Sequence, residues 1–349
     1  LPKEVLEKLD RAEVVFRDLV CRGEWDAVEL NRHEFENCVS EVFPTRRFGA
    51  VRENVEILVV ALAVAMGFRT YFLQPFKIPT GSMQPTLFGI QVREGVPSGC
   101  FDRQPLKVFK WLLFGEWYTE VRAGCDGIIR MPTPGDPQQD RIDCMFYVDN
   151  GSERIMHRIP RGGSIQEGRT VRKGDTLWSG IRVAGDHVFV DRVSWNFRGP
   201  KHAEIVVFST DGIPIISDQP LAPGTHYIKR LIGMPMEDIA IKPEGIAVNG
   251  KVIADPRNAA MSRQGRKVSY PPYQNTGPVA YVSDGRQYIP RLSSSRDHIQ
   301  LQNCEYFVMG DNTVSSLDGR YWGPVPSRNL IGPACVVYWP VSERWGRAK

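Results

Sequence analysis

Residues 227–235 read Tyr227-Ile228-Lys229-Arg230-Leu231-Ile232-Gly233-Met234-Pro235. Residues that favour strands are followed here by glycine and proline, a pattern typical of a short strand that ends in a turn. On such a strand the side chain of Lys229 shares a face with Tyr227 and Leu231. Its neighbour Arg230 takes the other face. The stretch therefore predicts a strand that carries one lysine on an apolar face.

Short runs of Val, Ile, Tyr and Phe recur after residue 180, and the chain contains 26 prolines and 32 glycines. This composition predicts many short strands joined by turns, so we expect a mainly β fold. The length of 349 residues and the hydrophobic content of 42% suit a catalytic domain of about 150–250 residues with additional segments. A net charge of +4 is too small to indicate a nucleic-acid partner.

The seven cysteines contain no Cys-x-x-Cys pair, and no histidine stands at metal-ligand spacing. This argues against a zinc site, and we expect neither a metal nor another cofactor. Cys100, Cys125 and Cys144 lie close enough in sequence for a disulfide among them to be considered.

The N-terminal segment predicts helices. Apolar residues at steps of four and three, with charged residues between them, form one stripe on a first helix: Val5, Leu9, Ala12, Phe16 and Leu19. A second helical stretch runs from about Trp25 to Phe43. We expect a small helical hairpin that packs on itself or on a partner, with a membrane-surface helix as the alternative.

The apolar stretch Ile57–Phe68 spans only twelve residues, fewer than the ~20 that a membrane-spanning helix needs. Continued through Arg69 to Phe76 it reaches that length, because an arginine near a helix end can extend toward the headgroups. Basic residues precede it at 46, 47 and 52, which predicts that residues 1–55 are cytoplasmic. We therefore expect one transmembrane helix at 56–76 that crosses the cell (inner) membrane once. The catalytic domain at 77–349 is then expected on the periplasmic or extracellular side.

The apolar stretch does not read as a cleavable secretory signal. It begins more than fifty residues into the chain, and Pro79-Thr80-Gly81-Ser82 follows it instead of an Ala-x-Ala site. The chain does not start with Met, which leaves open whether a further segment precedes residue 1.

Ser82 is the leading candidate nucleophile. It lies in Pro79-Thr80-Gly81-Ser82-Met83-Gln84-Pro85-Thr86, next to glycine and between two prolines, just beyond the apolar stretch. A protease that acts on membrane-inserted chains would hold its nucleophile there. The alternative is a plain loop, since most serines in such sequences only complete a turn.

Serine hydrolysis needs a base and donors for the oxyanion. None of the histidines stands in a sequence context that suggests a triad, although triad partners are distant along the chain, and His187 and His226 are expected to be edge or core side chains. Lys229 is the other candidate, because apolar neighbours lower a lysine pKa from ~10.4 toward the 7–8 that a base requires. Most strand lysines point to solvent, which is the alternative.

Two further segments of the chain belong to the same set of motifs. They are Gly185-Asp186-His187-Val188-Phe189-Val190 and the segment from Gly310-Asp311-Asn312 through Ser316, Asp318, Arg320, Tyr321, Trp322 and Gly323. With the Ser82 and Lys229 segments, and in this order, they resemble the sequence boxes of the type I signal peptidases (leader peptidases, peptidase family S26). These are serine–lysine proteases that remove signal peptides from exported proteins.

The resemblance implies roles for individual residues. Ser82 becomes the nucleophile and Lys229 the general base, while the Ser82 backbone N–H and the Thr80 hydroxyl form the oxyanion hole. Ser316 matches a serine that hydrogen-bonds and orients the lysine ammonium.

The supporting residues follow from the same resemblance. Asp318 and Arg320 match a charged pair that supports the site, and Gly310 and Asp311 open the turn of that box. The alternatives are a capped turn and a surface ion pair worth about 0–1 kcal/mol.

The family's activity is the cleavage of preproteins with small residues, typically alanine, at positions −1 and −3. The implied fold is a β-rich catalytic domain, and the implied partners are signal peptides, the lipid bilayer and, as a further candidate, the secretion translocon. No nucleic-acid partner is expected.

The chain departs from the family pattern in its turns. Thr313-Val314 replaces the usual Arg-Asp, Met234-Pro235-Met236-Glu237 replaces Leu-Pro-Gly-Asp, and His202-Ala203-Glu204 replaces Arg-Gly-Asp. Two segments, about 91–180 and 252–300, look like insertions. In the first, the aromatic-rich stretch Trp111–Tyr118 is expected to form core. The alternatives, in decreasing order of preference, are that it rests on the membrane surface or contacts the translocon.

Two other functions stay open. A self-cleaving repressor-type peptidase uses the same chemistry but is soluble and carries its own cleavage site. An inactive, export-associated binding protein could retain the fold. Intact Ser82 and Lys229 argue against this second alternative, whereas the altered turns keep it open.

Overall fold

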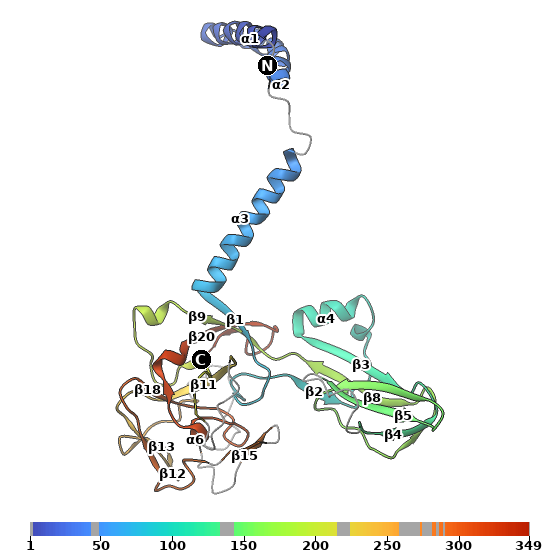
Figure 1. Cartoon of the computed structure of the whole chain (residues 1–349), viewed down its shortest axis with the longest axis vertical. Helices are drawn as coiled ribbons and strands as arrows, with labels where there is room; N and C mark the ends of the chain where they lie inside the picture. Colours follow the sequence, from blue (N-terminus) through green and yellow to red (C-terminus); the bar gives the residue numbers. More distant parts are fainter. Residues whose placement is uncertain are drawn as a thin grey trace. The chain divides into compact units, whose positions relative to one another are not determined.

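The computed structural model describes residues 3–42, 49–132, 143–214, 224–257, 273, 281–283, 286–288 and 290–348. The chain forms two compact units, residues 1–67 and 68–349. The second unit is built mainly from strands (Figure 1), which confirms the predicted mainly β fold.

The first unit contains a pair of helices, α1 (Lys3–Arg22) and α2 (Trp25–Val42). Gly23 has a φ of 72°, a left-handed conformation that glycine adopts without strain and that allows the sharp turn between the helices. The rings of Phe16 and Phe35 stack with their centroids 4.9 Å apart. The apolar stripe of the first helix therefore packs against the second helix.

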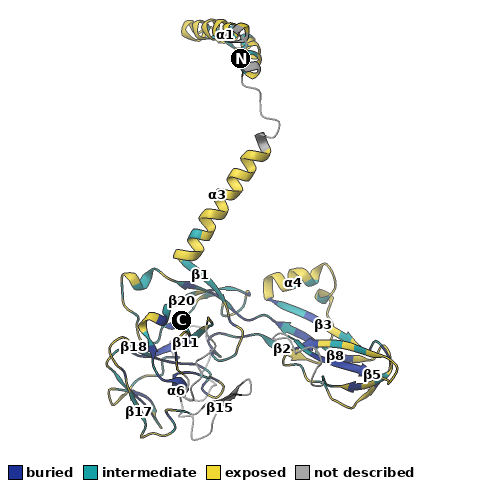
Figure 2. Ribbon diagram, viewed as in Figure 1, coloured by how far each residue is buried: buried dark blue, intermediate teal, exposed yellow. Residues whose placement is uncertain are grey.

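A third helix, α3 (Gly49–Tyr71), carries the apolar stretch Ile57–Phe68 with its large side chains exposed (Figure 2). Among the described residues, none of the helices combines the length and the apolar character that crossing a membrane requires. The spanning helix expected at 56–76 is therefore not confirmed.

The prediction that this helix continues to residue 76 is wrong, because α3 ends at Tyr71 and Leu73–Lys77 forms strand β1. Pro75 gives the physical reason, since proline lacks an N–H and disrupts a helix interior but is tolerated in an edge strand. β1 is such an edge strand of the central sheet.

The central sheet of the second unit is antiparallel throughout. In spatial order its strands are β1, β9 (His187–Asp191), β20 (Leu330–Trp339), β10 (Ile205–Ser209), β11 (His226–Gly233), β18 (Glu305–Met309) and β19 (Val325–Pro326). A short strand, β21 (Gly346–Arg347), pairs with β20. Segments from residues 73 to 347 thus meet in one sheet.

Both faces of this sheet are buried. In β10, Val206 and Phe208 pack into one hydrophobic core and Ile205 and Val207 into another, as the two-residue repeat of a strand requires. Each fully buried apolar side chain stabilises the fold by about 1.5–3 kcal/mol. Lys229 is the register partner of Val206 and so lies on the same face as the first core.

A second sheet contains β14 (Lys251–Val252), β13 (Gly245–Val248), β12 (Asp238–Lys242) and β17 (His298–Gln300), in that order. Strands β15 (Tyr281–Ser283) and β16 (Arg286–Tyr288) form a separate pair. Much of the expected insertion at 252–300, including the two prolines at 271 and 272, lies outside the described residues.

The other expected insertion forms two small sheets with their own core. One contains β2 (Gln91–Glu94), β8 (Thr176–Val183) and β3 (Glu116–Arg122). The other contains β6 (Arg154–Pro160), β5 (Asp143–Asp149), β4 (Gly127–Arg130) and β7 (Thr170–Val171).

The aromatic-rich stretch of this segment differs from expectation. Tyr118 is buried, but Trp111–Phe114 belongs to helix α4 (Leu106–Phe114), whose side chains there are 42–56% exposed. The expectation that this stretch forms core is therefore wrong for the helix. The helix contacts the end of β20, where the Trp339 indole donates to the Leu112 carbonyl. Because α4 is apolar on nearly all sides, a contact on one side cannot bury all of its apolar side chains.

Candidate active site

Ser82 lies in the loop between β1 and β2, and this loop is anchored by apolar side chains. Ile78, Met83 and Leu87 are at most 2% exposed and belong to the core under β9 and β10. The Leu87 N–H donates to the Met83 carbonyl at 2.9 Å. Burial on one side and a tight turn on the other fix the backbone around Ser82, whose own side chain stays partly exposed.

Two glycines let neighbouring backbones approach this loop. A Cβ atom on Gly89 would lie 2.3 Å from the carbonyl carbon of Thr80, and one on Gly185 would lie 1.9 Å from the carbonyl oxygen of Ile78. No side chain fits at such distances. The predicted Gly185-Asp186 motif thus serves to pack strand β9 against the loop that carries Ser82.

Lys229 lies against Ser82. Its side chain is 4% exposed, and its Nζ atom donates a hydrogen bond to the Ser82 Oγ atom at 2.7 Å. The two residues are 147 positions apart in sequence and are brought together by the pairing of β11 with β10 and β18.

Burial lowers the pKa of Lys229 to about 8, with Arg320 lowering it further and Asp318 and Asp311 opposing the shift. A buried ammonium loses its hydration, which disfavours the charged form. The Nζ atom also lies 5.7 Å from the centre of the Tyr227 ring. At this pKa a substantial fraction of the amine is neutral near pH 8 and able to accept a proton.

The turn at Gly310-Asp311-Asn312 holds the backbone of the nucleophile. The Asn312 N–H donates to the Ser82 carbonyl at 3.0 Å, and the Asn312 side-chain amide donates to the Gly81 carbonyl at 3.2 Å. A Cβ atom on Gly310 would lie 2.6 Å from the Ser82 carbonyl oxygen and 2.1 Å from the Ser316 Oγ atom. Only glycine leaves room for this packing.

Ser316 is buried beside this turn, but its hydroxyl forms no hydrogen bond within the described part of the chain. The bond from Ser316 to the Lys229 ammonium, implied by the resemblance, is therefore absent from the structure. The ammonium donates to Ser82 instead.

Asp318 and Arg320 form a buried ion pair, not a surface pair, at 0% and 2% exposure of their side chains. Two parallel hydrogen bonds of 2.9 Å join them, and the Gly310 N–H donates to Asp318 at 2.9 Å. Burial alone would raise the pKa of the Asp318 carboxyl, but Arg320, the Gly310 N–H and Lys229 hold it below its ordinary value. The pair therefore places one charge of each sign near Lys229 and fixes the turn.

A second buried network was missed by sequence reasoning. Arg230 donates to Asp311 through two bonds of 2.7 and 2.6 Å, and Asp311 also accepts from the hydroxyls of Thr86 and Tyr273. The Arg257 guanidinium donates to the Asp311 carbonyl at 3.1 Å. The available signal was Arg230 itself, because a charged residue inside an apolar strand needs a buried partner.

The Thr80 side chain is exposed and makes no hydrogen bond to any residue that the structure describes. It lies two positions before Ser82, and its hydroxyl remains able to donate to a substrate. The histidines are engaged elsewhere, with His187 against the Gly185 carbonyl and His226 against the Phe76 ring. Within the described ranges none of them bonds to Ser82.

All seven cysteines are free thiols, so the disulfide considered among Cys100, Cys125 and Cys144 is not present. In the described part of the chain no three His, Cys, Asp or Glu residues gather as a metal-ligand set.

Comparisons with known proteins connect part of the chain to a protein family. Residues 181–339 match the sequence model of the family described as "Signal peptidase, peptidase S26". That range contains Lys229 and the turn at Gly310, whereas Ser82 lies before it and is brought to Lys229 by the fold.

Three relatives carry signal peptidase names. A probable signal peptidase I-2 of Synechocystis sp. is 31% identical over 45% of this chain and 56% of the relative. A signal peptidase I of Leptolyngbya laminosa is 26% identical over 45% of this chain and 62% of the relative. A probable signal peptidase I-1 of Synechocystis sp. is 30% identical over 47% of this chain and 66% of the relative. The chain thus spans 56–66% of the length of these three relatives.

A crystal structure of a signal peptidase I from Enterococcus faecalis aligns with 22% identity and a TM-score of 0.25, over 39% of this chain and 97% of that chain. This score is too low to bear on the fold. Through residues 181–339, the chain is similar to the signal peptidases of peptidase family S26.

Proposed function

We propose that this protein is a serine endopeptidase that cleaves N-terminal signal peptides from exported preproteins. The observation that carries the proposal is the 2.7 Å hydrogen bond between a buried lysine, Lys229, and a partly exposed serine, Ser82. The relatives named signal peptidase I support the choice of substrate.

In the proposed first step the neutral Lys229 amine accepts the Ser82 hydroxyl proton as Oγ attacks the scissile carbonyl carbon. The C–O bond forms, and the carbonyl π electrons move to the oxygen. The Ser82 N–H and the Thr80 hydroxyl donate to this oxyanion. Such donors are typically worth about 2.7–4 kcal/mol of transition-state stabilisation each.

In the next step the Lys229 ammonium returns the proton to the leaving amine as the C–N bond breaks, which leaves an acyl ester on Ser82. The neutral lysine then takes a proton from water as the water oxygen attacks the ester carbon. The C–O bond to Ser82 Oγ breaks, the Lys229 ammonium returns the proton to Oγ, and the carboxylic acid product leaves. The Asp318–Arg320 pair and the Gly310 turn support both steps by fixing the backbone around the two residues.

Small residues at positions −1 and −3 of the substrate follow from the family resemblance. The test is cleavage of a preprotein with an Ala-x-Ala site by detergent-solubilised wild type, Ser82→Ala and Lys229→Met. We expect both folded variants to lose at least about 10³-fold in kcat/KM, since each removes a member of one catalytic unit. Circular dichroism checks the folding. Cleavage that survives in Lys229→Met would exclude the lysine base and return attention to the histidines.

Membrane association is a separate part of the proposal. The apolar side chains of α3 are exposed along the helix, as in Ile57 at 66% and Val64 at 67%, and burying them in lipid would be favourable. The division into residues 1–55, 56–76 and 77–349, with the last facing the periplasm or exterior, stays a prediction, as does contact with the translocon.

Carbonate extraction of cells that express the full chain tests this association. We expect the protein to stay with the membrane pellet, because α3 exposes more apolar surface than a water-soluble helix tolerates. Release into the supernatant would contradict membrane association and favour the soluble, self-cleaving type of serine–lysine peptidase.

A further inference from the structure

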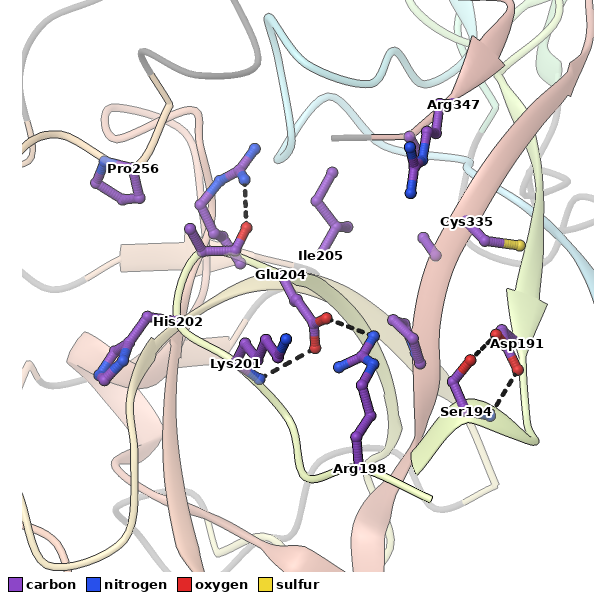
Figure 3. Close-up of a pocket in the computed structure, with 15 residues that line it drawn as sticks. Asp191, Ser194, Arg198, Lys201, His202, Glu204, Ile205, Pro256, Cys335 and Arg347 are labelled. Atoms are coloured by element: carbon purple, nitrogen blue, oxygen red, sulfur yellow. Dashed lines mark hydrogen bonds and ion pairs between the residues drawn. The ribbon is translucent and has the colours of Figure 1, made fainter. Parts of the chain in front are cut away.

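A cavity of about 570 Å³ is lined neither by Ser82 nor by Lys229. Its walls come from the segment after β9, the turn before β10, strand β20 and the C-terminal strand β21 (Figure 3). This volume falls within the range of about 300–1,000 Å³ that is usual for small-molecule sites. The cavity is therefore large enough to hold a ligand of its own.

The two carboxylates of the cavity are already occupied. Glu204 accepts from the Arg198 guanidinium at 2.6 Å, from the Trp195 indole at 3.2 Å and from the Lys201 backbone N–H at 3.1 Å. Asp191 is turned toward Ser194 (Figure 3) and accepts from its backbone N–H and its hydroxyl.

Among the residues that the structure describes, two cations of the cavity have no partner. The Lys201 ammonium and the Arg347 guanidinium form no hydrogen bond or ion pair with any described residue. Both are held by their backbones, since Arg347 pairs with Val336 in the sheet and the Lys201 carbonyl accepts from the Glu204 N–H. The other two arginines of the cavity, Arg198 and Arg230, are paired with Glu204 and Asp311. The cavity thus offers two positive charges on exposed side chains whose backbones are held in place.

We propose that this cavity binds a phosphate group carried by a small organic molecule. Lys201 and Arg347 would donate charge-assisted hydrogen bonds to the phosphate oxygens, which are the acceptors that such cations pair with most strongly. The buried side chains of Ile205 and Ala334 would contact the apolar part of the ligand.

The position of the cavity indicates a lipid headgroup as one source of the phosphate. Asp191, in the cavity wall, is the register partner of Leu73, and the neighbouring Arg192 N–H donates to the Phe72 carbonyl at 3.0 Å. Phe72 directly follows α3, so the wall begins where that helix ends. This source rests on the proposed membrane association, whereas phosphate binding itself does not.

The test uses the full chain in a non-ionic detergent and isothermal titration calorimetry. The probes are glycerol 3-phosphate and dihexanoyl phosphatidate, with glycerol and dihexanoylglycerol as phosphate-free counterparts. The variant is Lys201→Gln with Arg347→Gln. The matched control, Lys251→Gln with Arg296→Gln, removes the same charge from exposed positions outside the cavity.

We expect wild type and control to bind the phosphate probes but not their counterparts, and the cavity variant to bind them at least about 10-fold more weakly. Tighter binding of phosphatidate would assign the lipid source, and equal or tighter binding of glycerol 3-phosphate the soluble source. No binding by wild type, or equal binding by the cavity variant, would overturn the proposal. Preprotein cleavage by the cavity variant should match wild type, so a failure of the peptidase proposal would appear separately.

Discussion

Lys229 holds a charge where a charge is costly. Its side chain is almost wholly buried, and burial is the largest cause of its lowered pKa, ahead of the charges of Asp318, Arg320 and Asp311. Residues that place a titratable group in such surroundings destabilise the fold while they tune the group for catalysis. The lysine should therefore be a stability defect at neutral pH.

Replacing Lys229 by Met should stabilise the protein below pH 8. A pKa of about 8 in the folded chain against 10.5 for an ordinary lysine corresponds to a penalty on the order of 3 kcal/mol. Between pH 8 and 10.5 the folded state has released a proton that the unfolded state still binds. The unfolding free energy of wild type therefore rises with pH, and the stability difference between Lys229→Met and wild type shrinks. Urea unfolding of both proteins at about pH 6 and about pH 10 measures this. A variant less stable than wild type at pH 6 would contradict the buried, destabilised ammonium.

Sequence reasoning reached Ser82 and Lys229 as a pair, and it did so by resemblance. Strand alternation placed Lys229 on an apolar face, which its burial with Leu231 bears out. It could not supply the distance to Ser82, because that depends on strand pairing between segments far apart in the chain. For the same reason the partners of Arg230 and the lone hydroxyl of Ser316 were not foreseen.

At the level of elements, the turn after β18 acts as a clamp on the nucleophile loop. It holds the carbonyls of Ser82 and Gly81 through Asn312, and it is itself held by the Asp318 carboxylate through the Gly310 N–H. Arg230, Tyr273 and Thr86 fix Asp311 from the other side. The loop and the turn should therefore move as one body.

Gly310→Ala tests this clamp. The added Cβ would meet Ser316 Oγ at 2.1 Å and the Ser82 carbonyl at 2.6 Å, so the turn must shift away from the loop. We expect kcat/KM to fall by about 10²-fold, as for small displacements of catalytic groups, with a loss of about 1–3 kcal/mol in unfolding free energy.

Gly199→Ala is the matched control, because its Cβ would meet no atom within 4 Å. Unchanged kinetics in Gly310→Ala would show that the turn does not position Ser82.

Two departures from the family pattern lie in contact. His202 and Glu237, which stand where the family has other residues, are joined by a 2.8 Å contact between Nε2 and Oε2. Glu237 also accepts from the Met234 N–H at 2.7 Å. The altered turns thus support each other, which the sequence did not reveal because the two positions are 35 residues apart.

For the whole molecule, composition and turn residues were enough to predict a mainly β body. They were not enough to predict where the chain's apolar segments go. The apolar helix α4 is exposed, not buried in a core, and the stretch after Tyr71 forms an edge strand. Both outcomes depend on which surfaces the sheets leave open. Local patterns do not contain that information.

The central claim is that neutral Lys229 activates Ser82, and the most direct test is the pH dependence of kcat/KM for preprotein cleavage by wild type. Because the pKa of Lys229 is about 8, log kcat/KM should rise with a slope of one as pH increases and level off above about pH 8. A midpoint near the ordinary histidine pKa of about 6.5, or a rate that does not change through this range, would contradict the lysine base.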